Sequence, residues 1–462
     1  MPEYTWESGI AGWVRKNYPD YIGHVGDNSV QEVFSTENTK ITAAELAEFY
    51  GKIEAAIMKK EIIGLTTRSE MAADDRTASI SGLTMGVYLV TATGGTAVYR
   101  PTVAMITPVE SGGSWTITEN AQVGLKSSPV SLVKTITAVN AASDNVVSGD
   151  GKRAVAGVGD TVSYKLEVDV PEYPSQSVSR IFTITDTMPA GLTLQTDGIK
   201  VVDQTGNEIT IPTGLITATE RTLTINLDNS DLITGKTKLV VTYDAKLNAN
   251  APLGEAGNVN TASLTYSNNP YDADSAKTVV DTATVYIFGI EVAKVAKGTK
   301  TGLQGAVFEL KLKDTTQKIG FTGSGGAYTK AADGTAALTT GTDGKLTLEG
   351  LAPGTYKLKE TKAPAGYVLS AGETEITIAD TDFDGIPDSK EQPTTDTTTT
   401  QTTEKDKDNG LVSITVENTK GFTLPRTGGI GTVLFSMIGI VLMGSGVLLV
   451  AVFLRKRFGK SR

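Results

Sequence analysis

The chain has 462 residues and a formal net charge of −10 at pH 7. This length requires several domains with separate cores, and the negative charge excludes a nucleic-acid partner, because binding phosphates needs a basic face. The sequence has no cysteine, which excludes disulfides and cysteine chemistry. Short alternating runs such as residues 222–227, separated by glycine-rich turns, predict a mainly β fold of tandem β-sandwich domains.

The first domain is expected at residues 1–125 and should contain one helix among its strands. Thr42 and Glu45 have the spacing of a capping box, which marks the start of a helix. The apolar residues that follow fall on one helical face and are expected to form core: Leu46, Phe49, Tyr50, Ile53 and Ile57. This periodicity predicts a packing role for the helix and no ligand site.

A glycine-bounded turn occurs near both ends of the chain. The sequence Gly-Leu-x-x-Gly-x-Tyr is found at residues 82–88 and again at residues 350–356. Glycines at such positions mark a tight turn before a strand. We therefore expect two related sandwich modules, one near each end.

A membrane span closes the sequence. Residues 433–454 form one uncharged apolar run that is long enough to cross a bilayer as a helix. Arg455, Lys456 and Arg457 follow at once, and positive residues stay on the cytoplasmic side. The precursor is therefore expected to be membrane-anchored with everything before the span outside the cell. Its first residues show no signal peptide, so we expect a longer N-terminus in the exported precursor.

A pentapeptide stands directly before this span, and it consists of Leu424, Pro425, Arg426, Thr427 and Gly428. Pro425 favours an extended backbone, as a protease substrate needs. The order of pentapeptide, span and basic tail resembles the LPxTG sorting signal of Gram-positive cell-wall proteins. The resemblance implies that a sortase cuts between Thr427 and Gly428 and joins Thr427 to an amine, so that the protein ends attached to peptidoglycan at the cell surface.

The middle of the chain resembles the fimbrial isopeptide-formation domain of pilus backbone proteins. Four stretches within residues 129–288 carry the resemblance: 131–136, 164–174, 182–192 and 258–270. It implies an immunoglobulin-like sandwich of the CnaA type with a self-formed crosslink. The residues implied are Lys134, Asp186 and Asn260, with Asn258 as an alternative acceptor.

Residues 289–421 resemble the B-type repeat of collagen adhesins, the CnaB type. The resemblance rests on a first strand with Lys294, an E-box at residues 356–367 with Glu360, and a last strand ending at Asn418. Burial lowers a lysine pKa and raises a glutamate pKa, so a neutral amine can attack the asparagine amide while the acid moves protons. Each such bond is expected to join the first and last strands. The first domain lacks the E-box, and no crosslink is expected there.

Taken together, the sequence resembles the sortase-assembled major, or backbone, pilins of Gram-positive bacteria. The expected partners are a pilus sortase of class C, the housekeeping sortase, neighbouring subunits, and tip and base pilins. The acceptor of the neighbour's Thr427 is expected at Lys126, although the family's usual Tyr-Pro-x-Lys is replaced by Tyr-Pro-Ser-Gln at 173–176. The alternative function is a monomeric wall-anchored adhesin. An enzyme is not expected, because His24 is the single histidine and no nucleophile motif is present.

An insertion at residues 380–410 carries a calcium-like pattern and is followed by a threonine-rich stretch. Oxygen ligands recur with the spacing of a calcium loop: Asp380, Asp382, Asp384, the backbone carbonyl of Ile386, Asp388 and Glu391. Alternate carboxylates around a glycine are typical of such loops. The sequence predicts calcium at 380–391, with an acidic solvated loop as the alternative. No other cofactor is required.

Overall fold

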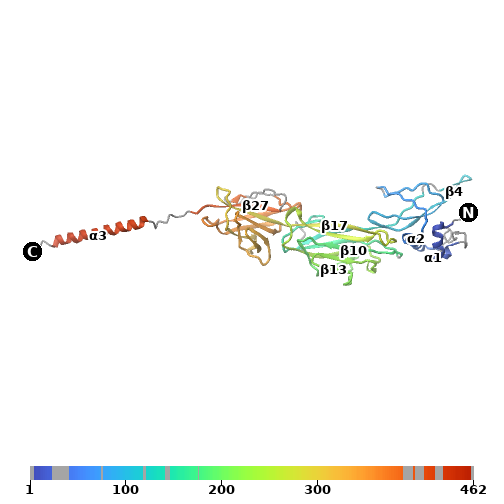
Figure 1. Cartoon of the computed structure of the whole chain (residues 1–462), viewed down its shortest axis with the longest axis horizontal. Coiled ribbons are helices and arrows are strands. Elements are labelled where there is room, and N and C mark those ends of the chain that lie inside the picture. Colours follow the sequence, from blue (N-terminus) through green and yellow to red (C-terminus); the bar gives the residue numbers. More distant parts are fainter. Residues whose placement is uncertain are drawn as a thin grey trace.

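The computed structural model describes residues 5–22, 41–73, 76–117, 121–140, 146–174, 176–388, 399–400, 410–421 and 430–458. Three modules follow one another along the long axis, with the N-terminal module at one end and a single long helix at the other (Figure 1). The mainly β fold with an N-terminal helix and a C-terminal apolar helix is confirmed.

The helices of the N-terminal module pack around Phe49. They are α1 (Ser8–Asn17), the short helix η1 (Pro19–Tyr21) and α2 (Ala43–Met58). The predicted capping box begins α2: the Thr42 side chain accepts a hydrogen bond from the Glu45 N–H, and the Glu45 carboxylate accepts one from the Thr42 N–H. Tyr18 and Tyr21 meet the buried ring of Phe49 edge to face, at centroid distances of 4.9 and 5.0 Å. Four of the five predicted stripe residues belong to this core: Phe49 and Ile53 are buried, Tyr50 and Ile57 are half-buried against it, and Leu46 is half-buried outside it.

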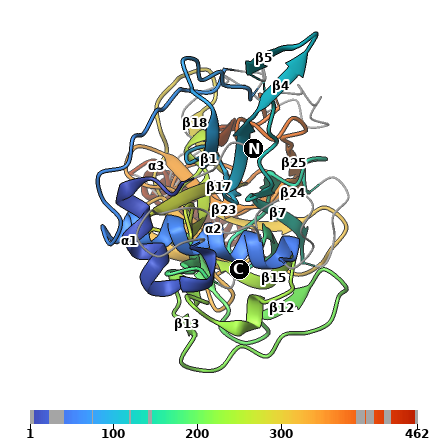
Figure 2. The ribbon, with the colours of Figure 1, turned by 90° about the vertical axis from the view of Figure 1, so that its right-hand side faces the viewer.

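The strands of this module form three two-stranded sheets in the described residues. β1 (Gly86–Val90) pairs with β3 (Thr102–Ile106), β2 (Ala97–Tyr99) pairs with β6 (Ser127–Pro129), and β4 (Pro108–Ser111) pairs with β5 (Ser114–Ile117). The β4–β5 hairpin points away from the rest (Figure 2). The complete sandwich that we expected here is not present in this described part, because several strand residues face solvent rather than a second sheet.

The repeated turn is nevertheless the same local structure at both ends of the chain. The Tyr88 hydroxyl donates to the Thr84 carbonyl at 2.8 Å, and the Tyr356 hydroxyl donates to the Ala352 carbonyl at 2.6 Å. In both cases the tyrosine is four residues after the carbonyl it contacts. The shared glycine pattern therefore predicted the turn correctly without predicting what the following strand packs against.

The middle module is a sandwich of two sheets. One sheet has the order β13-β14-β10-β16-β17-β8, and the other has the order β11-β15-β9-β7, with β12 also pairing with β15. Inner residues alternate with outer residues along the long strands, as expected for sheets with one buried face. The bounds are β7 (Leu132–Val139), β8 (Arg153–Val155), β9 (Thr161–Asp169), β10 (Phe182–Thr187), β11 (Leu192–Leu194), β12 (Lys200–Asp203), β13 (Ile216–Ala218), β14 (Thr222–Asn226), η3 (Asp231–Ile233), β15 (Lys238–Leu247), η4 (Gly254–Ala256), β16 (Asn258–Ser267) and β17 (Ala276–Tyr286).

The last module is a second sandwich, with the orders β20-β21-β23-β18-β27-β26 and β22-β19-β24-β25. Its first strand, β18, and the strand β27 are parallel neighbours. The bounds are β18 (Phe288–Ala296), β19 (Val307–Leu312), β20 (Phe321–Ser324), β21 (Ala327–Lys330), β22 (Leu338–Thr339), β23 (Lys345–Leu351), β24 (Gly354–Lys362), β25 (Glu373–Ile378), β26 (Thr399–Thr400) and β27 (Leu411–Asn418).

Both junctions between modules are packed. A loop of the middle module, residues 268–271, lies against α2, where Asn269 donates to Glu54 at 3.3 Å and Tyr271 is buried beside Gly51. At the other junction the Val158 N–H donates to the Gly350 carbonyl at 2.9 Å. These contacts connect the three modules beyond the peptide chain.

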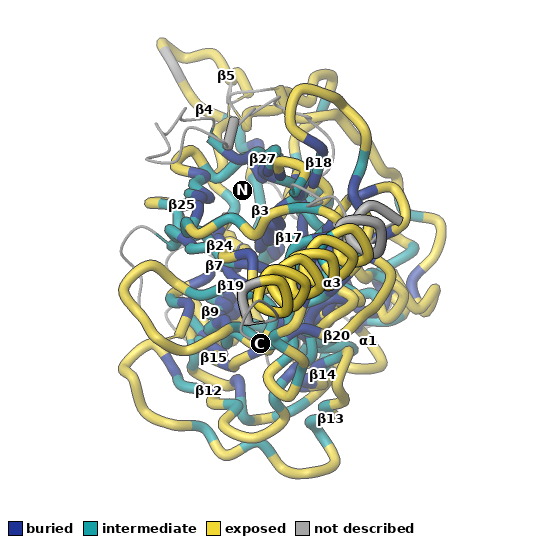
Figure 3. The backbone as a smooth tube through the Cα atoms, turned by 90° about the vertical axis from the view of Figure 1, so that its left-hand side faces the viewer, coloured by how far each residue is buried: buried dark blue, intermediate teal, exposed yellow. Residues whose placement is uncertain are grey.

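The C-terminal helix α3 (Ile430–Phe458) contains one segment, Ser436–Lys456, that is long and apolar enough to cross a membrane, with mean hydropathy 2.6. Its described side chains pack against nothing else in the chain, and Figure 3 shows this helix as an exposed rod. An apolar surface of this kind requires a lipid environment. The pentapeptide 424–428 lies outside the described residues.

Candidate functional site

The first candidate site is built by the parallel pair β18 and β27 and by β24 from the facing sheet. Lys294 on β18 stands opposite Val416, and Asn418 lies two residues further along β27. Because side chains two residues apart share a face of a strand, Lys294 and Asn418 point into the same interior. Glu360 reaches them from β24 across the sandwich.

These three side chains form a closed hydrogen-bonded triangle. The Lys294 Nζ donates to the Asn418 Oδ1, the Asn418 Nδ2 donates to the Glu360 Oε1 at 2.9 Å, and the Lys294 Nζ lies 3.3 Å from the same Glu360 oxygen. All three are buried, with Lys294 0% exposed. Burial lowers the pKa of Lys294, and the neighbouring Glu360 opposes this shift. A lysine in this setting can lose its proton and become a nucleophile.

The second candidate site lies in the middle module and bridges its two sheets. Lys134 comes from β7 in one sheet, whereas Asp186 on β10 and Asn260 on β16 come from the other. The Lys134 Nζ hydrogen bonds to the Asp186 Oδ2, and all three side chains are 0% exposed. Burial lowers the pKa of Lys134 to about 8 and raises the pKa of Asp186, so it favours the neutral form of both groups.

Tyr243 on β15 is a fourth member of this site, and the sequence did not identify it. Its hydroxyl accepts from the Lys134 Nζ at 2.6 Å, donates to the Asp186 Oδ2 at 2.8 Å, and accepts from the Asn260 Nδ2 at 3.2 Å. The alternation of β15 could have placed Tyr243 in the core. Its contacts could not have been found, because they depend on how the two sheets face each other.

The structure separates the two candidate acceptors of the middle module. Asn258 is buried on the same strand, but its Nδ2 donates to the Val285 carbonyl at 3.1 Å. It therefore lies at the β16–β17 ladder, and its Nδ2 donates to the Pro252 and Val285 carbonyls rather than bonding near Lys134. Asn260, by contrast, shares Tyr243 with Lys134.

One expectation about the middle site is wrong. We expected the lysine and the asparagine to lie on the first and last strands, as they do in the last module. Asn260 lies instead on β16, and β17 follows it before the chain enters the last module. The physical reason is that β16 and β17 form an antiparallel hairpin beside β10, so the inner position across from Lys134 belongs to the strand before the last.

Lys126 is exposed, at the junction between the N-terminal and middle modules. It directly precedes β6, and its carbonyl accepts from the Arg100 N–H at 2.9 Å. Two residues later, the Ser128 hydroxyl accepts from the Glu172 N–H at 3.3 Å. The segment containing Lys126 therefore runs beside the start of the Tyr-Pro-Ser-Gln segment that replaces the family's lysine motif.

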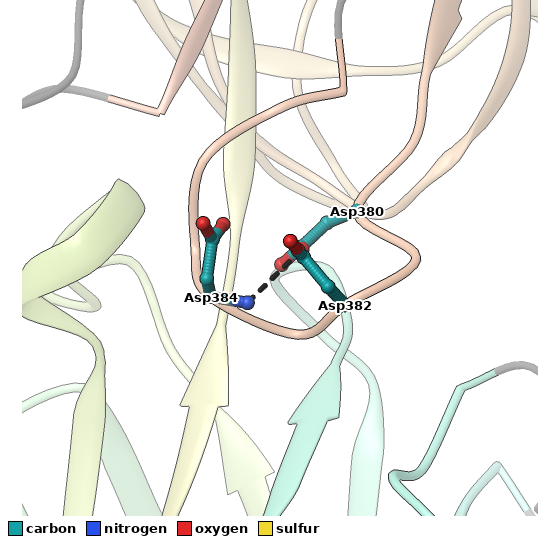
Figure 4. A group of neighbouring side chains, drawn as sticks. All are labelled: Asp380, Asp382 and Asp384. Carbon is teal, nitrogen blue, oxygen red and sulfur yellow. Dashed lines mark hydrogen bonds between the residues drawn. The ribbon is translucent and has the colours of Figure 1, made fainter.

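The acidic loop brings three of its six predicted ligands together. Ligand oxygens of Asp380, Asp382 and Asp384 lie within 4.8 Å of one another, and the Asp384 N–H donates to Asp380 (Figure 4). Asp388 is used differently, because its Oδ2 accepts from the N–H and the hydroxyl of Thr381 at 2.8 and 2.7 Å. Glu391 lies outside the described residues, and the Ile386 N–H donates to the Asp384 Oδ1 at 2.7 Å. Calcium binding stays a prediction.

Two family profiles match this chain. Residues 288–391 match SpaA, a prealbumin-like fold domain, and residues 416–457 match the LPXTG cell wall anchor motif. The first covers most of the last sandwich, including Lys294 and Glu360. The second covers the pentapeptide, the apolar helix and its basic end.

Similarity to known proteins extends over the other modules. The trypsin-resistant surface T6 protein of Streptococcus pyogenes serotype M6 is 26% identical over an alignment of 366 positions, and the match covers 64% of this chain and 64% of that protein. The solved structure of the three-domain T6 backbone pilin of serotype M6 Streptococcus pyogenes covers 86% of this chain and 94% of its own, with 21% identity and a TM-score of 0.61. The chain has the fold of a Gram-positive backbone pilin. A solved pilus 2b backbone protein of group B streptococcus is 28% identical over 63% of this chain and 99% of its own, with a TM-score of 0.41.

The pilin fold, the anchor motif and the apolar helix together confirm the predicted location at the cell surface, attached to the cell wall. The similar proteins are named as pilins and as a surface protein rather than as enzymes. Both observations agree with the interpretation of the sequence as a structural surface protein.

Proposed function

We propose that this protein is the shaft subunit of a sortase-assembled pilus, joined to its neighbours through covalent bonds between Thr427 and a lysine. The observation that carries the proposal is the combination of a backbone-pilin fold with a cell-wall anchor motif. A polymer of this kind needs one reactive group at each end of the subunit. The anchor motif supplies the acyl group at the C-terminal end, and Lys126 supplies an exposed amine at the base of the N-terminal module.

Lys126 is supported as the acceptor by its surroundings. The salt bridge between Arg100 and Glu172 joins the strand segment next to Lys126 to the start of the Tyr-Pro-Ser-Gln segment. The family's lysine position and Lys126 are therefore distant in the sequence but lie along neighbouring segments. A pilus sortase that docks at this junction can therefore reach the amine of Lys126, although the neighbouring segment has no lysine.

The test of the shaft role is polymer formation in cells that produce a pilus sortase, followed by immunoblotting of wall extracts. The unchanged chain should give a ladder of high-mass bands, and Lys126→Ala should give one band. Lys246→Ala, which removes an exposed lysine of β15, should keep the ladder. One band from the unchanged chain contradicts the shaft role and favours the monomeric adhesin, whereas a ladder from Lys126→Ala shows that another lysine is the acceptor.

We also propose that each sandwich closes its own Lys–Asn isopeptide bond. The neutral lysine amine attacks the Cγ of the asparagine, a C–N bond forms, and the bond from Cγ to Nδ2 breaks. One proton leaves the lysine nitrogen and one reaches the leaving nitrogen, which departs as ammonia. Glu360 contacts both nitrogens in the last module, so one carboxyl group can carry both transfers.

Intact-mass measurement tests this chemistry. Two bonds should lower the mass by about 34 Da, because each bond releases one ammonia of about 17 Da. Lys294→Ala and Lys134→Ala should each leave a loss of about 17 Da, because one pair of reactants is removed. Asn258→Ala is the control and should keep the full loss. A mass equal to that of the unmodified sequence contradicts both crosslinks.

A further inference from the structure

The two candidate sites differ in how their acid reaches the asparagine amide. In the last module one oxygen of Glu360 contacts both nitrogens, at 2.9 Å from the Asn418 Nδ2 and 3.3 Å from the Lys294 Nζ. In the middle module the acid is Asp186, whose side chain is shorter by one methylene. Asp186 hydrogen bonds to Lys134 and also interacts with Asn260, but the hydrogen bond of the Asn260 amide nitrogen at 3.2 Å goes to the Tyr243 hydroxyl.

The Tyr243 hydroxyl therefore contacts both nitrogens in the middle module, as one Glu360 oxygen does in the last module. It lies 2.6 Å from the Lys134 Nζ, 2.8 Å from the Asp186 Oδ2 and 3.2 Å from the Asn260 Nδ2. It contacts both nitrogens whose bonds change in the crosslinking reaction. A hydroxyl can donate and accept at the same time, which a phenyl ring cannot do.

We propose that Tyr243 is a catalytic residue of the middle module, whose hydroxyl carries a proton from the attacking Lys134 nitrogen to the leaving Asn260 nitrogen. This inference rests on the proposed crosslink between Lys134 and Asn260. It adds a group that the last module does not need, because Glu360 there makes both contacts itself.

The proton balance of the step is closed. As the Lys134 nitrogen bonds to the Cγ of Asn260, it must lose a proton, and the Tyr243 oxygen accepts it while giving its own proton to the Asn260 Nδ2. The bond from Cγ to Nδ2 then breaks and ammonia leaves. Tyr243 ends with the proton from Lys134, so it is regenerated. Burial raises the pKa of Asp186, which favours its protonated form, and in that form Asp186 can supply and recover the proton of the tetrahedral intermediate.

The surroundings hold the hydroxyl in place and keep water out. The ring of Tyr243 stacks on Tyr164 at a centroid distance of 5.4 Å and an interplanar angle of 15°, and both side chains are buried. The Lys134 Nζ lies 4.8 Å from the centre of the Tyr164 ring. The Oδ1 atoms of Asp186 and Asn260 are buried without a hydrogen-bond partner, which is costly in a finished structure.

The test compares Tyr243→Phe with the unchanged chain, as full-length protein in detergent. Samples are taken at intervals after synthesis, and intact mass and peptide mapping follow each bond. The unchanged chain should lose about 34 Da. Tyr243→Phe should lose about 17 Da at the same time, with the Lys134 to Asn260 bond forming on the order of 100-fold more slowly, the usual minimum effect of a lost proton-transfer group. Tyr266→Phe, which removes another buried hydroxyl of the same module, should behave as the unchanged chain.

Melting temperature separates catalysis from packing. Lys134→Ala gives the reference for a middle module without its bond, and Tyr243→Phe should melt close to it before crosslinking. If Tyr243→Phe melts close to Lys134→Ala and still crosslinks slowly, the result supports the proton relay through Tyr243. Crosslinking at the unchanged rate, or a melting temperature well below the reference, overturns it. If the unchanged chain itself forms no bond between Lys134 and Asn260, the proposed crosslink fails and the relay fails with it.

Discussion

Glu54 is a buried carboxylate at the junction between the N-terminal and middle modules. It is 4% exposed, and Asn269 donates to it at 3.3 Å. Burial raises its pKa to about 7, and the hydrogen bond from Asn269 opposes part of this shift. The folded junction therefore binds a proton that the unfolded chain releases above its ordinary pKa of 4.5. This bound proton therefore stabilises the folded junction fully below pH 4.5, and the stabilisation is lost as the pH rises through about 7.

We expect the N-terminal module to melt at a lower temperature at pH 8 than at pH 5, with a loss of at most roughly 3 kcal/mol at about 1.4 kcal/mol per pKa unit. Glu54→Gln keeps the shape and removes the charge, so its melting temperature should vary much less with pH. Glu48→Gln, on the exposed face of the same helix, is the matched control and should keep the dependence. Equal pH dependence in Glu54→Gln would assign the effect to another group.

At this scale the sequence was informative where a residue belongs to a recognisable stretch. Lys294, Glu360 and Asn418 were found because each lies in a motif of its own strand, and the structure brings them into contact. Tyr243 has no such motif, since its role depends on a sheet packed across from it. The calcium pattern is different: its spacing predicted six ligands, and in the structure three of them lie together while the Asp388 carboxylate accepts a hydrogen bond from Thr381.

At the scale of elements, β7 is an edge strand, and side chains from other segments form hydrogen bonds with the backbone on its unpaired side. Asp281 on β17 accepts from the Lys134 N–H at 2.7 Å, and Lys152 donates to the Lys134 carbonyl at 2.7 Å. Lys152 and Asp281 also pair with each other. This arrangement fixes both backbone groups of Lys134 and so its position along β7. It could not be predicted from the sequence, because the three residues lie in separate segments.

Strand order explains which parts of the fold were predictable. Alternating burial along β9, β15 and β27 follows directly from the sequence pattern, so the sandwich class was predicted. The order of strands within a sheet depends on long-range pairing. For this reason the sequence correctly predicted that the first and last strands of the last module are neighbours. In the middle module it wrongly predicted that the crosslink joins the first and last strands, because Asn260 lies on β16 and β17 follows it.

At the scale of the whole molecule, the proposed bonds define the path of a pulling force. If a neighbour is attached at Lys126, tension enters the chain there and residues 1–125 carry none of it. The N-terminal module then needs no crosslink, in agreement with its missing E-box. In the last module the bond between Lys294 and Asn418 carries the load from the first strand to the last, and the chain between them is bypassed.

The middle module is different, because β17 lies outside its covalent loop. Force passes from Lys134 to Asn260 through the bond and then continues along β16 and β17 to Tyr286. Asn258 and Val285 are paired at the loaded end of this hairpin, so the two strands separate one pair at a time from that end. The contacts of Asp281 with Lys134 and Lys152, the short pairing of β17 with β8, and the burial of Ala283 and Val285 in the core resist this opening.

We therefore expect the crosslinked chain to lengthen once before it becomes inextensible. Handles can be attached through Lys126→Cys and Lys420→Cys, since the chain has no other cysteine. Roughly 26 residues follow Asn260 up to the end of β17, and at about 3.5 Å per residue they give a step of at most about 90 Å.

Asp281→Ala should lower the force of this step and leave its length unchanged. Asp244→Ala, on the exposed face of β15, should alter neither. Lys134→Ala cannot form the bond and should give a much longer step. An unchanged chain with no step up to rupture of the handles would show that β17 stays attached under load.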